Sequence, residues 1–170
     1  MKGTILIDGY LPNSSNLFEW LEKNIEWDDR MKSRKTASFG VSYDYSEISY
    51  FNTGMPLTLF SVSKNIEKVV GFESNNCLLN YYVDGKSTMG FHSDDVSVLE
   101  EGTGVVILSL GETRILRFKH KISKEIKDFE LKGGSFFYMS QEIQNEWVHS
   151  IPSSDTDGSR ISLTFRKIRR

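Results

Sequence analysis

The sequence predicts one mainly β domain over residues 1–170, a β-sandwich or jelly roll flanked by N-terminal α-helices. Two observations predict this fold class. From Cys77 onward, short segments rich in β-branched and aromatic residues follow one another, separated by turn pairs such as Asp84-Gly85 and Gly133-Gly134. Before Cys77, apolar residues recur instead at helical spacing. Because no helices alternate with the strands, a parallel α/β fold is not expected.

The N-terminal part, about residues 1–76, is expected to supply the helices. Asn13-Ser14-Ser15 offers helix N-caps, and apolar residues then follow at helical spacing up to Ile25. A second helix is expected from about Phe60 to Val70. Between the two helices, the stretch from Ala37 to Tyr50 is rich in tyrosine, serine and glycine, which is typical of a strand or a flexible hairpin.

The C-terminal part, about residues 77–170, is expected to form the sheets. The expected strands are Cys77–Val83, Gly104–Leu110, Arg114–Lys119, Lys127–Leu131, Ser135–Met139 and Arg160–Ile168. No repeat, low-complexity tract or linker divides the chain, so all 170 residues are expected to form a single domain.

Composition excludes some classes and leaves others open. No apolar run approaches the roughly 18 residues that span a membrane, so no membrane partner is expected. The single cysteine, Cys77, excludes an internal disulfide; it fits a small buried core residue and an intracellular protein, cytoplasmic in a prokaryote. A net charge of −2 does not by itself indicate nucleic-acid binding, although basic residues cluster, for example from Arg30 to Lys35.

Two histidines and one aspartate have the spacing of a metal site. If the segment around Phe91-His92-Ser93-Asp94 is extended, His92 and Asp94 leave from the same face, and His149 follows 55 residues after Asp94. Two His and one carboxylate form the facial triad of non-haem Fe(II) oxygenases. The pattern is weak alone, because ordinary half-buried histidines produce it by chance; His120, in a basic strand, is expected to be such a residue.

The last expected strand strengthens the metal hypothesis. It alternates strictly, with Ile161, Leu163 and Phe165 on one face and a polar face made of Arg160, Ser162, Thr164 and Arg166. The two arginine Cα atoms are expected roughly 20 Å apart, so side chains leaning inward would leave a gap for a short dicarboxylate. Asn80 and Tyr82 also share a face and could donate hydrogen bonds to a carboxylate. The alternatives are an exposed basic edge strand and an ordinary half-buried strand.

In order along the chain, these residues resemble the AlkB family of Fe(II)/2-oxoglutarate dioxygenases. The matching motifs are Asn80-x-Tyr82, His92-Ser93-Asp94-Asp95, Ser109-Leu110-Gly111-x-x-Arg114, Leu131-x-Gly133-Gly134-Ser135-x-x-x-Met139, Trp147-x-His149-Ser150-Ile151-Pro152 and Arg160-x-Ser162-Leu163-Thr164-Phe165-Arg166. More loosely, residues 5–12 and 34–45 look like the family's entry strand and lid.

The resemblance implies a double-stranded β-helix, the jelly roll already expected, with Fe(II), 2-oxoglutarate and O₂ as its cofactor and co-substrates. It implies His92, Asp94 and His149 as the iron ligands and catalytic centre. It implies that 2-oxoglutarate is bound by the residues Asn80, Tyr82, Arg160, Ser162 and Arg166. Ser162 stands where an Asn is common in the family, and the sequence does not indicate which arginine binds which carboxylate.

The resemblance further implies oxidative demethylation of N-alkylated bases, of the 1-methyladenine and 3-methylcytosine type, in DNA or RNA, by a monomer. Tyr43 is the expected base-stacking residue, with Tyr45, Phe39 and Asp95 as further substrate contacts. Val96 stands where many relatives carry an acid that reads the base. Two alternatives therefore stay open: an oxygenase acting on a protein side chain, a modified tRNA or a small molecule, and a non-enzymatic jelly-roll binding module with a structural metal or none.

Overall fold

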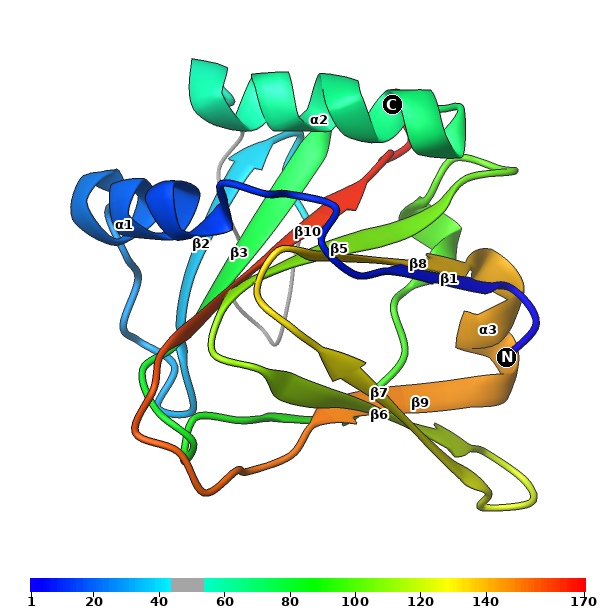
Figure 1. The fold of residues 1–170 in the computed structure, drawn as a ribbon. Helices are drawn as coiled ribbons and strands as arrows, with labels where there is room; N and C mark the ends of the chain where they lie inside the picture. The colour runs from blue at the N-terminus through cyan, green and yellow to red at the C-terminus, as the bar shows by residue number, and fades with distance from the viewer. Residues whose placement is uncertain (44–53) are drawn as a thin grey trace.

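The computed structural model describes residues 1–43 and 54–170, which form two antiparallel β-sheets facing each other (Figure 1). The larger sheet has the strand order β1-β8-β5-β10-β3-β2, and the smaller has β4-β9-β6-β7. The strands are β1 (Thr4–Ile7), β2 (Lys35–Gly40), β3 (Asn76–Tyr82), β4 (Met89–His92), β5 (Gly104–Gly111), β6 (Arg114–His120), β7 (Ile126–Leu131), β8 (Ser135–Ser140), β9 (Trp147–Ile151) and β10 (Arg160–Arg166). The helices are α1 (Ser14–Asn24), α2 (Leu57–Val70), α3 (Gln141–Glu146) and the short 3-10 helix η1 (Val96–Val98). The expected jelly roll with N-terminal helices is confirmed.

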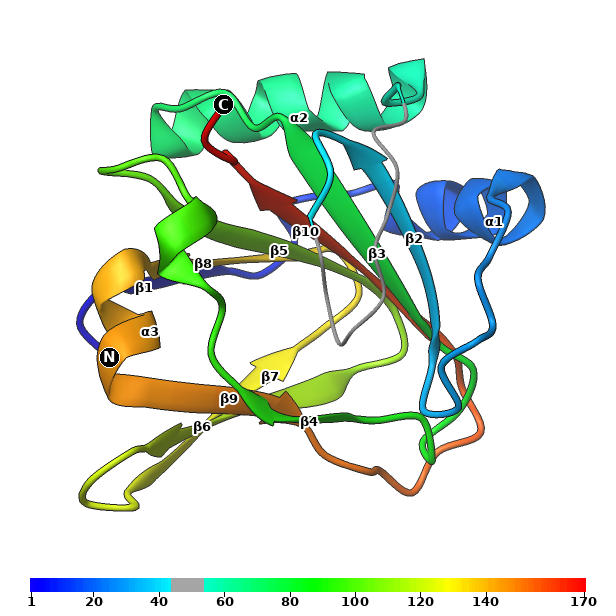
Figure 2. The ribbon, with the colours of Figure 1, turned by 180° about the vertical axis from the view of Figure 1, so that it is seen from behind.

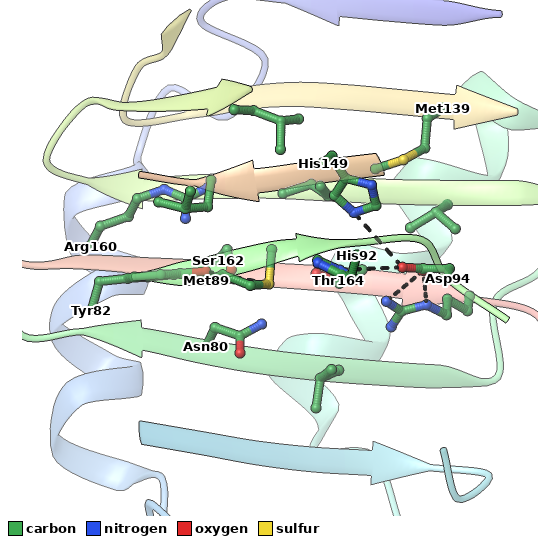
Figure 3. Close-up of a pocket in the computed structure, with 16 residues that line it drawn as sticks. Asn80, Tyr82, Met89, His92, Asp94, Met139, His149, Arg160, Ser162 and Thr164 are labelled. Carbon is green, nitrogen blue, oxygen red and sulfur yellow. Dashed lines mark hydrogen bonds and ion pairs between the residues drawn. The ribbon is translucent and has the colours of Figure 1, made fainter. Parts of the chain in front are cut away.

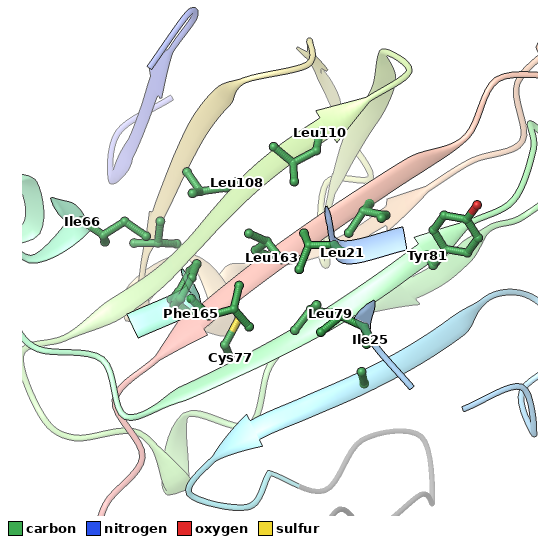
Figure 4. Packing of buried hydrophobic residues seen from close by; sticks show 14 of the residues in the cluster. Leu21, Ile25, Ile66, Cys77, Leu79, Tyr81, Leu108, Leu110, Leu163 and Phe165 are labelled. Carbon is green, nitrogen blue, oxygen red and sulfur yellow. The ribbon is translucent and has the colours of Figure 1, made fainter. Parts of the chain in front are cut away.

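Helices α1 and α2 both lie on the outer face of the larger sheet, and the smaller sheet lies on its other side (Figures 1 and 2). This arrangement produces two buried clusters. The cluster beneath the helices includes Leu21, Ile66, Leu79, Leu163 and Phe165 (Figure 4). The cluster between the sheets includes Tyr82, Phe118 and Phe137.

Strand β10 is central in the larger sheet, and all seven of its residues are buried. Its alternation separates the two layers as the sequence predicted: Ile161, Leu163 and Phe165 join the helix-side cluster, while the polar residues face the space between the sheets. Ser162 pairs with Asn80 on β3 and with Ser109 on β5. The polar residues Asn80, Ser162 and Ser109, on three neighbouring strands, therefore lie side by side.

Most element boundaries agree with the sequence to within a residue or two, and two differences have a clear cause. Helix α2 begins at Leu57, directly after Pro56, whose fixed φ suits the start of a helix. Helix α3 was not expected, because six mostly polar residues carry no helical periodicity. No helix among the described residues is long and apolar enough to cross a membrane.

Candidate active site

A cleft between the two sheets contains the candidate iron ligands and the candidate 2-oxoglutarate residues (Figure 3). His92, Asp94 and His149 lie at one end of it, and Arg160 and Tyr82 at the other. Asn80 and Ser162 lie along the wall formed by the larger sheet. The polar face predicted for β10 therefore lines a cleft and is not an exposed edge.

The triad converges because strands β4 and β9 are paired. His92 is directly opposite His149, with ring centroids 4.3 Å apart, and Asp94 follows two residues after β4 ends. Oδ1 of Asp94 lies 3.7 Å from Nε2 of His92 and 3.8 Å from Nε2 of His149. Candidate ligand atoms of all three residues lie within 4.8 Å of one another, so a single ion can contact them all.

The carboxylate of Asp94 is oriented by Arg166. Nε of Arg166 donates to Oδ2 at 2.8 Å, and Nη2 forms an ion pair with the same oxygen at 2.7 Å. Oδ1 is buried and has no hydrogen-bond partner among the described residues. A buried carboxylate oxygen that faces two imidazoles and lacks a donor is the arrangement expected of a metal ligand bound through one oxygen.

Further contacts hold the ligand-bearing segment in place. The backbone N–H of Asp94 donates to Oε1 of Gln144 on α3 at 2.8 Å, and the hydroxyl of Ser93 donates to the carbonyl of Trp147 at 3.0 Å. Nδ1 of His92 lies 2.9 Å from the carbonyl oxygen of Gly90. Since a carbonyl only accepts, Nδ1 carries the hydrogen and Nε2 presents its lone pair to the cluster.

The protonation states also suit a metal. Burial lowers the pKa of His149 to about 3, with a further contribution from nearby His92, and burial also lowers the pKa of His92. Burial alone would raise the pKa of Asp94, but Arg166 is the largest of the opposing causes, and the net shift is downward. Two neutral nitrogens and one anionic oxygen are the donor set of non-haem Fe(II) sites.

The far end of the cleft contains a buried cation. Arg160 is 1% exposed, its Nε donates to the hydroxyl of Ser109 at 2.8 Å, and its guanidinium lies 5.0 Å from the Tyr82 ring centroid. Nη1 of Arg160 has no hydrogen-bond partner among the described residues. A buried guanidinium with an unused donor fits the carboxylate of a bound anion.

The structure gives several of the other expected site residues partners within the protein. Arg166, expected to hold 2-oxoglutarate, lines the cleft and is paired with Asp94, and its contact with the co-substrate stays a prediction. Tyr43, expected to stack on a base, is 6% exposed and packs under the Arg166 guanidinium at 4.3 Å. Phe39 pairs with Cys77 and packs against the helix-side cluster, so it does not line the cleft. The carboxylate of Asp95 accepts a hydrogen bond from the backbone N–H of Ser97 and caps η1.

Tyr45 lies outside the described residues. The buried Cys77 and the half-buried His120, which contacts Trp147 edge-on, agree with the structural roles expected of them. Sequence reasoning missed Gln144, Ser109 and Arg34, all of which contact residues of the cleft. Ser109 is the first residue of a family motif, and Arg34 begins the segment 34–45 that looks like the family's lid; the contacts of Arg34 and Gln144 depend on the tertiary fold.

Comparison with known proteins agrees with this geometry. A model of the 2OG-Fe(II) oxygenase superfamily matches residues 14–166. The uncharacterized protein R406 of Acanthamoeba polyphaga mimivirus is 31% identical over 130 residues, covering 75% of this chain and 68% of that protein. The DNA oxidative demethylase ALKBH2 of Bos taurus is 28% identical over 91% of this chain, and the match spans 64% of that longer protein.

Two further matches have lower identity or concern the fold alone. The alpha-ketoglutarate-dependent dioxygenase alkB homolog 3 of Bos taurus is 27% identical over 93% of this chain and 63% of that protein. The solved structure of OsALKBH1 shares the fold with a TM-score of 0.74 at 14% identity, covering 98% of this chain and 99% of the other. The chain therefore belongs to the AlkB family within the 2OG-Fe(II) oxygenase superfamily, the dioxygenases that use Fe(II), 2-oxoglutarate and O₂.

Proposed function

We propose that this protein removes N-linked methyl groups from alkylated bases, of the 1-methyladenine and 3-methylcytosine type, in DNA or RNA. The observation that carries the proposal is the buried His92–Asp94–His149 cluster, which opens into a cleft with the Arg160 cation at its far end. The relatives support the substrate class, since one of them is a DNA oxidative demethylase. Iron with 2-oxoglutarate and O₂ supplies the oxidation: one oxygen atom enters succinate as CO₂ leaves, and the other enters the methyl group, which departs as formaldehyde.

Some residues of the cleft would bind the metal, and others would bind the co-substrate. His92, Asp94 and His149 would hold the iron, and Arg166 keeps Asp94 anionic and turned so that Oδ1 faces the metal. Arg160 would bind the carboxylate of 2-oxoglutarate that lies farthest from the iron. Because Arg160 is buried, its attraction to such a carboxylate would be stronger than at the protein surface.

The rim beside His92 is the side from which a base would approach. The His92 side chain is 22% exposed, whereas that of His149 is 3% exposed. Next to it in the sequence, Phe91 is 43% exposed, and Nζ of Lys119 lies 4.1 Å from its ring centroid. Because neighbouring residues of a strand point to opposite faces, this ring and cation lie on the outer face of the smaller sheet and not in the cleft.

The test is turnover of short oligonucleotides, single- and double-stranded, that carry one 1-methyladenine or 3-methylcytosine. With Fe(II), ascorbate and 2-oxoglutarate, we expect loss of the methyl group by mass spectrometry, with formaldehyde and succinate formed in equal amounts. A D94A variant is the inactive control. Unchanged oligonucleotide mass alongside active 2-oxoglutarate turnover would refute the proposal.

A second candidate is an oxygenase that acts on a protein side chain, a modified tRNA or a small molecule. Two observations favour it: Val96 offers no charge to read a base, and the Asp95 carboxylate is engaged by Ser97. The same assay separates the candidates, because the second predicts 2-oxoglutarate consumption that the methylated oligonucleotides do not increase.

A further inference from the structure

Arg34 is a buried cation that joins three segments beside the cleft. It directly precedes β2 and is 5% exposed. Its Nε donates to Oδ1 of Asn80 on β3 at 2.8 Å, and its Nη1 donates to the carbonyl of Thr88 at 3.0 Å. Thr88 directly precedes β4, the strand that ends at His92. A single side chain thus connects the start of β2 to the cleft wall and to the strand that carries a metal ligand.

The contact with Arg34 determines which way the Asn80 amide faces. A guanidinium only donates, so the atom of Asn80 that faces it must be the oxygen. The amide nitrogen then points the other way; Figure 3 shows it on the cleft side, with the oxygen turned towards β2. The opposite orientation would place the amide N–H groups against the guanidinium donors and a carbonyl oxygen towards any anion in the cleft.

We propose that Arg34 is a positioning residue that fixes the Asn80 amide as a hydrogen-bond donor to 2-oxoglutarate. The inference rests on the assignment of the cleft to 2-oxoglutarate made under the proposed function. Asn80 pairs with Ser162 between the two charged ends of the cleft, so its N–H groups face the path between Arg160 and the metal cluster. A donor at that point suits a carboxylate oxygen, and an acceptor would repel it.

The test measures the dissociation constants of 2-oxoglutarate and of iron separately, under anaerobic conditions and without nucleic acid. The visible absorption of the Fe(II)–2-oxoglutarate chelate reports 2-oxoglutarate binding. For R34M we expect 2-oxoglutarate to bind roughly tenfold more weakly, the effect of losing one good hydrogen bond. The iron dissociation constant should change less than the 2-oxoglutarate dissociation constant. R117M is the matched control, because Arg117 pairs with Asp128 on the exposed face of the β6–β7 hairpin.

Two Asn80 variants make the result specific. N80D has nearly the same shape and still accepts from Arg34, but it cannot donate to a carboxylate; it should lose 2-oxoglutarate affinity while keeping its melting temperature. The double variant R34M/N80A should bind 2-oxoglutarate no more weakly than N80A, because Arg34 acts through Asn80. N80D also keeps the inference testable if R34M fails to fold.

Three outcomes would overturn the inference: unchanged 2-oxoglutarate affinity in R34M, additive losses in the double variant, or N80D that binds 2-oxoglutarate as tightly as the wild type. A weakened R34M combined with no demethylation of oligonucleotides would support this inference and refute the proposed substrate. The two failures are therefore distinguishable.

Discussion

Replacing Arg166 by methionine should weaken iron binding more than 2-oxoglutarate binding. The side chains of Arg166 and Asp94 are 4% and 1% exposed, and Nε of the guanidinium donates to the same oxygen of Asp94 with which Nη2 forms an ion pair. Methionine keeps most of the apolar stem and removes the charge. Breaking a buried ion pair by removing one partner costs about 3–5 kcal/mol of stability, because the remaining charge is left uncompensated. Loss of a residue that orients a metal ligand typically weakens metal binding roughly 10- to 100-fold.

The direction of the pH effect follows from the causes of the Asp94 pKa. Burial raises that pKa and Arg166 lowers it, so the carboxyl in R166M should take up a proton at a higher pH than in the wild type. Protons then compete with the metal, and the loss of iron affinity in R166M should grow as the pH falls. Titration with Fe(II) under anaerobic conditions at several pH values measures this loss, and urea unfolding of the metal-free protein measures the stability. Normal iron affinity together with lost 2-oxoglutarate affinity would refute the reasoning and restore Arg166 as a co-substrate residue.

Three other predictions concern the rest of the cleft and the core. R160M should lose about 2–5 kcal/mol of 2-oxoglutarate binding free energy, because a buried carboxylate would lose its charged partner. A comparable loss of iron affinity would contradict the role of Arg160 as a co-substrate residue. In the metal-free protein, His149 has a folded-state pKa of about 3, below its unfolded value of about 6.5. Between these two pKa values the unfolded state binds more protons, so the free energy of unfolding should fall as the pH drops below the unfolded value, by up to about 1.4 kcal/mol per pH unit. Urea unfolding at pH 7 and pH 5 checks this, and an H149Q variant with the same pH dependence would contradict it. Burial raises the pKa of the Cys77 thiol, so a thiol reagent at pH 8 should label it only after denaturation, and rapid labelling of the native protein would show the opposite.

Much of the fold was predictable because β10 lies between two different layers, the helices on one side and the cleft on the other. Its alternating apolar and polar residues place one set against the helices and the other in the cleft, and the period of two leaves no other arrangement for a central strand. The convergence of His92 and Asp94 was predictable for a related reason, since they are two residues apart at the end of a strand. The approach of His149 depends on the pairing of β4 with β9, which local pattern does not encode.

The partners of individual side chains were the part that sequence could not supply. Arg160 and Arg166 are residues of the same type on the same face of the strand, so the sequence pattern does not distinguish their roles. In the structure they differ because different residues surround them: Ser109 and Tyr82, on the neighbouring strands β5 and β3, lie near Arg160, and Asp94, which follows β4 of the facing sheet, lies near Arg166. Phe39 shows the reverse case, since its type suits base stacking but its position in the β2 register turns it towards the helices.

The charges of the cleft predict that the metal and the co-substrate increase each other's binding affinity. Among its described lining residues the formal charges are those of Arg160, Arg166 and Asp94, two positive and one negative, because both histidines are neutral. Arg166 already forms the ion pair with Asp94, so Arg160, at the end away from the triad, is the lining cation whose charge no described carboxylate of the cleft balances. A dicarboxylate with one end at Arg160 places its other negative charge towards the triad, where a bound divalent metal would neutralise it. Metal and 2-oxoglutarate should therefore strengthen each other's binding, and by thermodynamic linkage the gain must be equal in both directions. Arg166 contributes to this coupling because it keeps the triad carboxylate ionised and aimed at the metal.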